Sequence, residues 1–378
     1  GGWQNVPIKE AENGCDIYTT FDANLMDICE TALRKRLEHT QAEWGCVVLM
    51  DVQTGEVKAM SNLDRASDEH YYEIANHSVV RMEPGSTFKT VSLMAALDDG
   101  EIKMSDTIRV YEDGWWYHGA KHKDSHPSDT VYTIRQSLAV SSNIALAKIV
   151  TDGYDGSAKK FVKKLKDMGL CDSVDYTIPG AKQALIQVPK DTVTISKMAY
   201  GYSVELSPLQ ILMFYNGIAN DGKMIAPLFV KEIRKKGKII EEYESCVVNG
   251  RMCDASTLQG IRECLHDVVW DNELGTASVN PWGTRKAQSD LVSIAGKTGT
   301  AQIREKGYSD SRHRMSFVGY FPEENPEYSC ICLIHAPHWP YDAGLDCGTV
   351  VRQIAEKTMA YAGEYVIKDG DFVLTVRE

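Results

Sequence analysis

Strand-like segments near both ends of the chain enclose a long helix-rich middle, and this arrangement restricts the possible folds most. An apolar hairpin with a Thr-Gly turn is predicted at 45–60. Three more strand-like segments follow a long way downstream, at 292–302, 315–321 and 328–335. We expect both ends to build one antiparallel sheet with helices packed against it, which is an α+β fold.

Helical periodicity recurs along the rest of the chain. The helices are expected at 23–40 after the cap Asp22, between Gly85 and Gly100, and at 134–150, 157–169, 208–219, 257–269 and 348–361. Further strands are expected at 15–20, 226–233 and 238–243. Residues 61–82 and 101–132 are expected to be irregular. The aromatic run 115–117 in the second of these segments either packs within the loop or lines a cleft.

The composition is that of a globular protein with a large core. Of 378 residues, 43% are hydrophobic and 25% are charged. The formal net charge is −12 and the basic residues are scattered, which argues against nucleic-acid binding. No apolar run is long enough to cross a bilayer. The ten cysteines include no C-x-x-C pair and no metal-ligand spacing, so no metal site is expected and their disulfide state stays open.

A serine and a lysine lie at the start of one predicted helix, in the run 83–89 (EPGSTFK). Ser86 and Lys89 are three residues apart, which places them on one helix face. A serine hydroxyl is a weak nucleophile at neutral pH unless a base lies close to it. A lysine can be that base when burial lowers its pKa, and the helix N-terminus adds free N–H groups nearby. The alternative is an unrelated serine and lysine on an ordinary helix surface.

Two more polar motifs lie downstream. The run 140–143 (VSSN) interrupts an apolar helical region, and buried polar groups are costly unless they are hydrogen-bonded. The interruption is either an internal cap or a break where two helices meet at a site. The run 297–300 (KTGT) lies on a predicted strand whose small residues allow close approach. A phosphate-binding turn is disfavoured because the upstream glycine of a P-loop is missing.

The three motifs occur in the order S-x-x-K, S-D-N (here S-S-N) and K-T-G, which is the set found in penicillin-binding proteins and class A β-lactamases. Over nearly all of residues 1–378 the chain resembles the transpeptidase domain of class B penicillin-binding proteins, and EPGSTFK is most similar to the division-specific members. The resemblance implies a β-lactamase/transpeptidase-like fold with about five central strands, from 45–60 and 292–336, and a helix-rich subdomain inserted at about 61–290. It also implies a membrane anchor and an N-terminal pedestal outside the given sequence.

The resemblance implies a catalytic role for four residues. Ser86 would be the nucleophile that attacks the penultimate carbonyl of a D-Ala-D-Ala stem peptide, and Lys89 would be the base for acylation. Ser141 would relay protons to the leaving amine. Asn143 would orient Lys89 and the substrate amide.

The KTGT run is implied to bind the substrate. Lys297, Thr298 and Thr300 would face the terminal carboxylate, and an ammonium and two hydroxyls suit that group. Gly299 would let a peptide lie against the strand. The backbone N–H groups of Ser86 and Thr300 would form the oxyanion hole.

The implied activity is peptidoglycan D,D-transpeptidation in cell-wall (septal) synthesis. Ser86 would form an acyl-enzyme and release D-alanine, and an amine of a neighbouring stem peptide would then form the cross-link. β-Lactam antibiotics would mimic the donor and acylate the same serine. The implied location is the periplasmic face of the bacterial inner membrane, with partners such as a membrane glycosyltransferase and with no metal or organic cofactor.

Related proteins share these motifs. A class A β-lactamase is disfavoured because the middle motif is S-S-N and because Glu205 does not lie in a loop resembling that of the deacylating glutamate. A class D β-lactamase would carry an aliphatic residue in place of Asn143. An elongation-specific transpeptidase, a D,D-carboxypeptidase and a β-lactam-sensing receptor domain stay open as alternatives.

Overall fold

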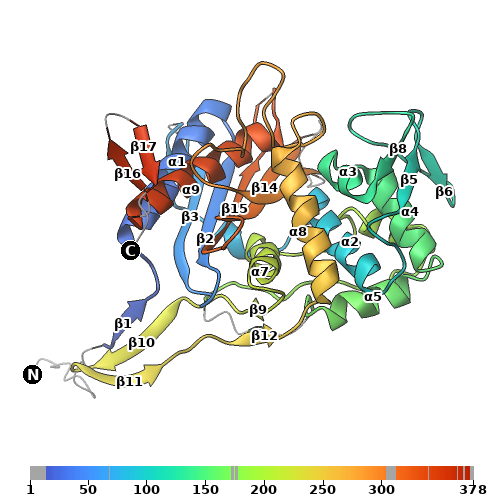
Figure 1. Ribbon diagram of the computed structural model, residues 1–378. Coiled ribbons are helices and arrows are strands. Elements are labelled where there is room, and N and C mark those ends of the chain that lie inside the picture. Colours follow the sequence, from blue (N-terminus) through green and yellow to red (C-terminus); the bar gives the residue numbers. More distant parts are fainter. Residues whose placement is uncertain are drawn as a thin grey trace, which may run out of the picture.

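A computed structural model shows a central sheet covered by helices on both faces, with a helix-rich part beside one sheet edge (Figure 1). The structure describes residues 14–67, 69–171, 174, 178–303, 312–338 and 340–363, and only the backbone of 365–368 and 371–374.

The α-helices and short helical turns account for much of the middle of the chain. They are α1 (Ala23–Thr40), η1 (His77–Val79), η2 (Gly85–Thr87), α2 (Phe88–Asp98), α3 (Ile134–Ala139), α4 (Asn143–Gly153), α5 (Ala158–Asp167), α6 (Thr194–Met198), α7 (Pro208–Ala219), α8 (Ala255–Trp270), η3 (Gly344–Gly348) and α9 (Thr349–Tyr361). The strands of the central sheet are β2 (Trp44–Asp51), β3 (Val57–Arg65), β4 (Tyr71–Tyr72), β13 (Ala295–Gln302), β14 (His313–Phe321) and β15 (Tyr328–His335). The other strands are β1 (Asp16–Thr19), β5 (Thr107–Val110), β6 (Trp115–Tyr117), β7 (Ala120–His122), β8 (Thr130–Thr133), β9 (Met224–Ile225), β10 (Val230–Lys235), β11 (Lys238–Glu242), β12 (Val247–Asn249), β16 (Tyr365–Lys368) and β17 (Asp371–Leu374).

The central sheet joins the two ends of the chain. In the described residues its order is β13-β14-β15-β2-β3-β4, with every neighbouring pair antiparallel. β15 pairs directly with β2, so that Ile331 lies opposite Val48. The predicted α+β fold is therefore confirmed. The sheet has six strands in the described residues instead of about five, because β4 adds an edge strand, and β3 continues beyond its predicted end to Arg65. The predicted strand ends early because polar residues interrupt its apolar pattern. One of them, Asn62 on β3, is accommodated in the sheet because its side-chain oxygen accepts hydrogen bonds from the backbone N–H and the hydroxyl of Ser78, both at 3.0 Å.

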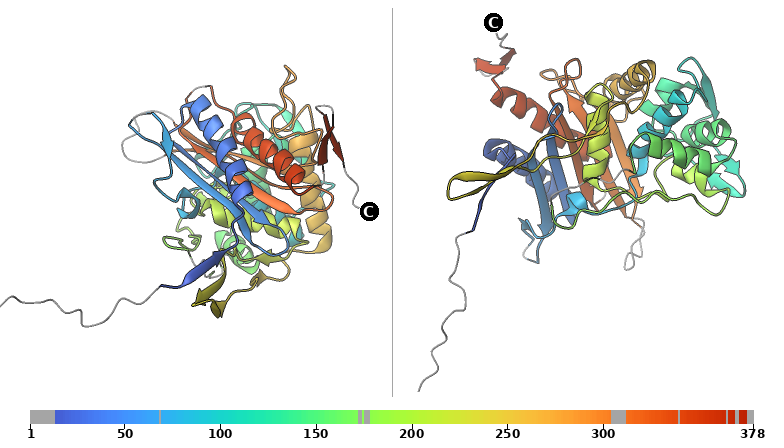
Figure 2. Two further views of the ribbon diagram at one scale, coloured as in Figure 1. Left: turned by 90° about the vertical axis from the view of Figure 1, so that its left-hand side faces the viewer. Right: turned by 90° about the horizontal axis from the view of Figure 1, so that it is seen from below.

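Both faces of the sheet are buried. On β2, Val47 and Leu49 belong to the core formed with α1 and α9, whereas Val48 and Met50 belong to the core that contains α2, α7 and α8. The left view of Figure 2 shows α1 and α9 side by side over the first of these faces. This alternation explains why the strands are almost continuously apolar, since successive side chains point to opposite faces.

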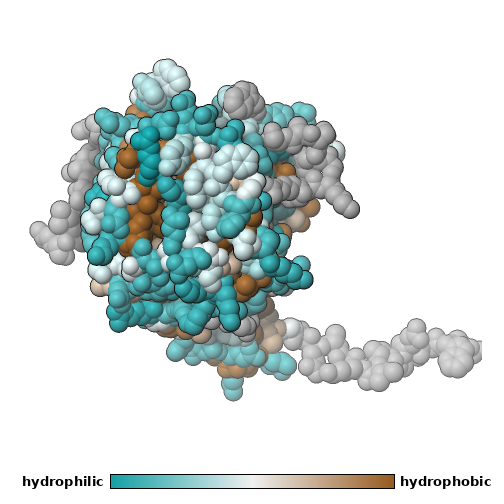
Figure 3. All heavy atoms as spheres, turned by 90° about the vertical axis from the view of Figure 1, so that its right-hand side faces the viewer, coloured by the Kyte–Doolittle hydropathy of each residue, from teal (hydrophilic) through white to brown (hydrophobic). Residues whose placement is uncertain are grey.

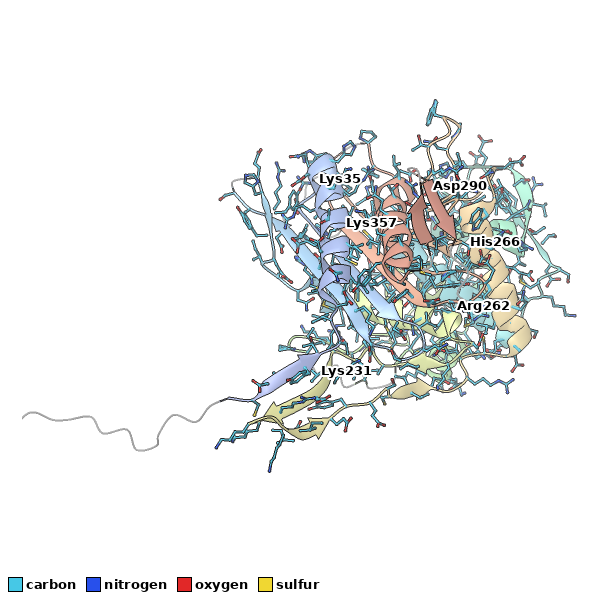
Figure 4. All side chains as sticks on the ribbon, turned by 60° about the vertical axis from the view of Figure 1, so that its left-hand side comes forward. Lys35, Lys231, Arg262, His266, Asp290 and Lys357 are labelled. Atoms are coloured by element: carbon cyan, nitrogen blue, oxygen red, sulfur yellow. The ribbon has the colours of Figure 1, made fainter. Side chains whose placement is uncertain are left out.

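Helix α8 connects the helix-rich part to the sheet. Its Arg262 donates hydrogen bonds to two C-terminal carbonyls of α7, those of Ile218 (2.8 Å) and Ala219 (3.0 Å). A cation is favourable at this end of a helix. His266, one turn further along α8 (Figure 4), lies 2.9 Å from Glu323, which follows β14. α8 is thereby fixed beside β13 and the end of α7.

Residues 101–132 differ from the prediction, because the expected loop contains the short antiparallel pairs β5–β8 and β6–β7. Each strand has only three or four residues, too few to show an alternating pattern among polar neighbours. In the aromatic run, Trp115 stacks on Tyr117 with ring centroids 5.4 Å apart, whereas Trp116 is 62% exposed. The face that carries these hairpins is mainly hydrophilic (Figure 3).

A separate three-stranded sheet, β1-β10-β11, forms an arm that extends from the body (Figures 1 and 2). Lys231 on β10 (Figure 4) forms an ion pair with Glu56, at 2.7 Å, beside the hairpin of the central sheet. No disulfide joins the cysteines in the described part of the chain. Among the described helices, none combines the length and apolar character that a bilayer span requires.

Candidate active site

Ser86 lies in η2, directly before α2, in a turn that touches two distant segments. Gly85 has a φ of +59°, and an added Cβ would lie only 2.9 Å from the carbonyl oxygen of Thr300 on β13. The Gly85 N–H donates to the carbonyl of Gly201 at 3.1 Å. Glycine at position 85 therefore permits both the left-handed turn and the close approach of β13. Ser86 itself is half-buried, and its hydroxyl has no hydrogen-bond partner among the described residues.

Lys89 is buried in the first turn of α2 and reaches the middle motif. Its side chain is 1% exposed, and Nζ donates to the carbonyl oxygen (2.5 Å) and the hydroxyl (3.0 Å) of Ser141. Burial lowers the pKa of Lys89 to about 7, while the charge of Asp124 acts in the opposite direction. A large fraction of this amine is therefore neutral at neutral pH, as a general base requires.

The middle motif is a break between two helices. α3 ends at Ala139 and α4 begins at Asn143, and Ser142 caps α4 by accepting the N–H of Ala145 at 3.0 Å. Both alternatives from the sequence therefore apply, a cap and a helix junction. Ser141 has a φ of +56°, in a region that is uncommon for residues other than glycine. The Asn143 amide donates to the carbonyl of Lys123 at 2.8 Å, and its role toward Lys89 stays a prediction.

The KTGT run lies on β13, the edge strand nearest to η2. Lys297 is completely buried, and Nζ donates to the carbonyl (3.0 Å) and hydroxyl (3.3 Å) of Thr298. Burial, together with the charge of Lys89, lowers the pKa of Lys297 well below its usual value. A Cβ at Gly299 would lie 2.4 Å from the Ser316 hydroxyl. Thr300 is exposed.

The fold thus brings the three motifs together. Lys89 contacts Ser141 directly, and a Cβ at Gly299 would meet Thr87 of η2 at 2.9 Å, so β13 lies against the turn that carries Ser86. The turn that carries Ser86, two buried amines and the edge of a strand therefore lie together. This arrangement can ionise a hydroxyl and hold an anion close to it.

Two polar residues at the site were missed in the sequence. Asp124 accepts hydrogen bonds from the start of α4, and the Thr276 hydroxyl lies 2.6 Å from that of Thr298. Both follow from tertiary contacts, and no local pattern in the sequence marks them. Within the described ranges, no group of His, Cys, Asp or Glu side chains is arranged to hold a metal ion.

Known proteins of one family are similar to this chain. Residues 45–359 match the family described as the penicillin-binding protein transpeptidase domain. "Probable peptidoglycan D,D-transpeptidase PenA" of Neisseria flavescens is 26% identical over 365 residues, which cover 93% of this chain and 84% of that protein. The protein of the same name from Neisseria gonorrhoeae is 26% identical over 341 residues, or 87% of this chain, but this chain spans only about half (54%) of it.

The solved transpeptidase domain of penicillin-binding protein 3 from Burkholderia pseudomallei has the same fold, with a TM-score of 0.75 at 24% identity. The superposition covers 91% of this chain and 96% of that one. With a family match over most of its length, the chain belongs to the penicillin-binding protein transpeptidase domain family.

Proposed function

We propose that the chain is a serine D,D-transpeptidase that cross-links peptidoglycan stem peptides and is acylated by β-lactams. The observation that carries the proposal is the buried Lys89 amine, which has a pKa of about 7 and is hydrogen-bonded to Ser141 one helical turn from Ser86. Neutral Lys89 accepts the proton of Ser86 as the serine oxygen attacks the penultimate carbonyl of a D-Ala-D-Ala donor. The proton then passes through Ser141 to the nitrogen of departing D-alanine, and an ester to Ser86 is left.

The second half of the reaction reverses these proton transfers. An acceptor amine attacks the ester and loses a proton toward Lys89, an amide forms, and Ser86 regains its hydroxyl. The backbone N–H groups of Ser86 and Thr300 are proposed to hold the oxyanion in both halves. Since β13 is one of the two edge strands of the central sheet in the described residues, a stem peptide can lie along it as an added strand.

The donor's terminal carboxylate is proposed to bind at Lys297, Thr298 and Thr300. Lys297 is buried and its charge is disfavoured by burial and by Lys89, so an entering carboxylate restores a favourable charge on this amine. The hydroxyls of Thr298 and Thr300 add hydrogen-bond donors at the same strand. Asn143 is proposed to hold the substrate amide.

The activity is tested by giving the protein a D-Ala-D-Ala donor peptide together with an amino acceptor peptide. We expect cross-linked peptide and released D-alanine, both measured by mass spectrometry, because the acyl group is passed to an amine. Shortened donor without cross-linked product would instead identify a carboxypeptidase. A stable penicillin adduct with no peptide product would identify a sensor domain.

Replacing Lys297 with alanine is expected to slow acylation by an anionic penicillin about 10- to 100-fold, since a charge-assisted hydrogen bond contributes about 1.5–3 kcal/mol. The second-order rate constant of labelling measures this effect. A penicillin ester, which lacks the negative charge, is the matched control and should be affected much less. An equal loss for both compounds would remove Lys297 from the carboxylate site.

The cellular setting is also proposed. The EPGSTFK run favours a septal role over an elongation role. A peptidoglycan substrate requires a location outside the cytoplasm, and we propose the periplasmic face of the inner membrane, with an anchor and pedestal outside the given sequence. A membrane glycosyltransferase that supplies new glycan strands is the proposed partner.

A further inference from the structure

A carboxylate outside the three motifs holds the middle motif in place. Asp124 lies two residues after β7 and is half-buried. One of its oxygens accepts the Ser142 hydroxyl at 2.7 Å, and the other accepts the backbone N–H groups of Asn143 (2.5 Å) and Ile144 (3.0 Å). A negative charge at a helix N-terminus is favourable, and three donors at once fix the first turn of α4.

The residue before Asp124 reinforces this attachment. The carbonyl of Lys123 accepts the side-chain amide of Asn143 at 2.8 Å. The pair 123–124 therefore holds both the backbone and the side chain of Asn143. Ser141 has an unfavourable positive φ, which is maintained because the chain on its C-terminal side is fixed in this way. Its carbonyl and hydroxyl are then presented to Lys89.

The 123–124 segment is itself firmly anchored. His122 at the end of β7 is 2% exposed, and its ring nitrogens lie 2.8 Å from the hydroxyl of Tyr200 and 3.1 Å from that of Ser196. Tyr200 precedes Gly201, whose carbonyl accepts the Gly85 N–H beside Ser86. A chain of contacts thus connects the turn that carries Ser86 with the turn that contacts Lys89.

Asp124 also affects the charge of Lys89. The charge of Asp124 acts on this amine, and the charge of Lys89 acts in turn on Lys297. Asp124 raises the pKa of Lys89 and so opposes the effect of burial, whereas the mutual repulsion of the two amines disfavours the charge of Lys297. Asp124 is therefore the counter-charge of this part of the site.

We propose that Asp124 is a positioning residue for acyl transfer, which fixes residues 141–143 against Lys89 and supplies the negative charge beside that amine. The inference rests on the proposed function, because it assigns Asp124 to the proton transfer between Ser86 and Lys89. Asp124 contacts neither Ser86 nor Lys89 by a hydrogen bond, so it acts through Ser142, Asn143 and its charge.

The test compares the pH dependence of acylation by a fluorescent penicillin in the wild type and in Asp124→Asn. The acylation rate should rise with pH as Lys89 loses its proton. Without the carboxylate, the pKa of Lys89 falls further, so the rising part of the pH–rate profile (the limb) should move to lower pH. The limiting acylation rate at high pH should fall about tenfold or more. A merely structural role would reduce the rate and leave the limb in place.

Two further variants make the test decisive. Asp129→Asn is the matched control, because Asp129 pairs with Arg109 at 3.3 Å on the exposed surface and should acylate like the wild type. Asp124→Glu keeps the charge but displaces it, so its rate should fall with the limb unmoved. Circular dichroism and thermal unfolding establish that each variant is folded. If Asp124→Asn is not folded, Asp124→Ser, which also lacks the charge, takes its place in the pH comparison.

The inference is overturned if Asp124→Asn acylates at the wild-type rate, or if its rate falls while the limb stays in place. It is also overturned if Asp124→Glu acylates at the wild-type rate. Absence of acylation in the wild type would contradict the proposed function instead, so the two failures are distinguishable.

Discussion

Ser86→Ala is expected to abolish the covalent attachment of penicillin. The change removes the hydroxyl that is proposed to form the ester. The backbone carbonyl of Ser86, which accepts the N–H of Phe88 in this turn, is left in place. The neighbours Gly85 and Thr87, which make the contacts with β13, are unchanged. Intact-protein mass spectrometry after incubation with penicillin should show one added β-lactam on the wild type and none on the variant.

Ser92→Ala provides a matched control from the same helix. Ser92 is completely buried in α2, and its hydroxyl finds no hydrogen-bond partner in the described residues. Removing an unpaired buried hydroxyl does not cost a hydrogen bond, so labelling should be unchanged and stability should not fall. Wild-type labelling of Ser86→Ala would exclude Ser86 as the nucleophile. Loss of labelling in Ser92→Ala would mean that α2 is sensitive to any change.

The parts of the fold that were predictable are those in which local chemistry and burial agree. Helix α1 begins directly after Asp22, whose carboxylate accepts the N–H groups of Asn24 and Leu25, and such a cap is visible in the sequence. The central strands were predictable because both of their faces are buried. β4 and β5–β8 were not, since strands of two to four residues are too short to carry a periodic signal.

Some residues of the candidate site could likewise be predicted from the sequence, and others could not. Ser86 and Lys89 are close in sequence, so helical spacing alone places them together. Their proximity to Ser141 and Lys297 was inferred from the known order of three motifs, because no local property of residues 140–143 or 297–300 indicates which segment they meet. Asp124 lies in a stretch expected to be a loop, and its hydrogen bonds to α4 depend on how the β6–β7 hairpin is anchored.

Lys89→Met is expected to slow acylation and at the same time to stabilise the fold. Loss of a general base costs about 10²–10⁴-fold in rate. The stabilisation follows from burial, because a pKa lowered from 10.5 to about 7 corresponds to about 5 kcal/mol of unfavourable free energy for the charged amine. Methionine is apolar and of similar length, but it leaves the carbonyl of Ser141 without its partner, which costs about 1–3 kcal/mol. A net gain of roughly 2–4 kcal/mol is therefore expected below about pH 7.

This gain should depend on pH with a defined sign. Between about pH 7 and 10.5 the unfolded wild type holds one more proton at Lys89 than the folded protein does, so wild-type stability rises with pH across this window. The advantage of Lys89→Met should accordingly be largest at pH 6.5 and smaller at pH 9, as measured by urea unfolding of both proteins. Buried thiols titrate equally in both, so their contribution cancels in the difference. Lys159→Met, at an exposed position on α5, should change neither acylation nor the pH dependence. If the difference in free energy of unfolding between the two proteins does not shrink from pH 6.5 to pH 9, Lys89 stays charged in the folded protein over this range. It could not then act as the base.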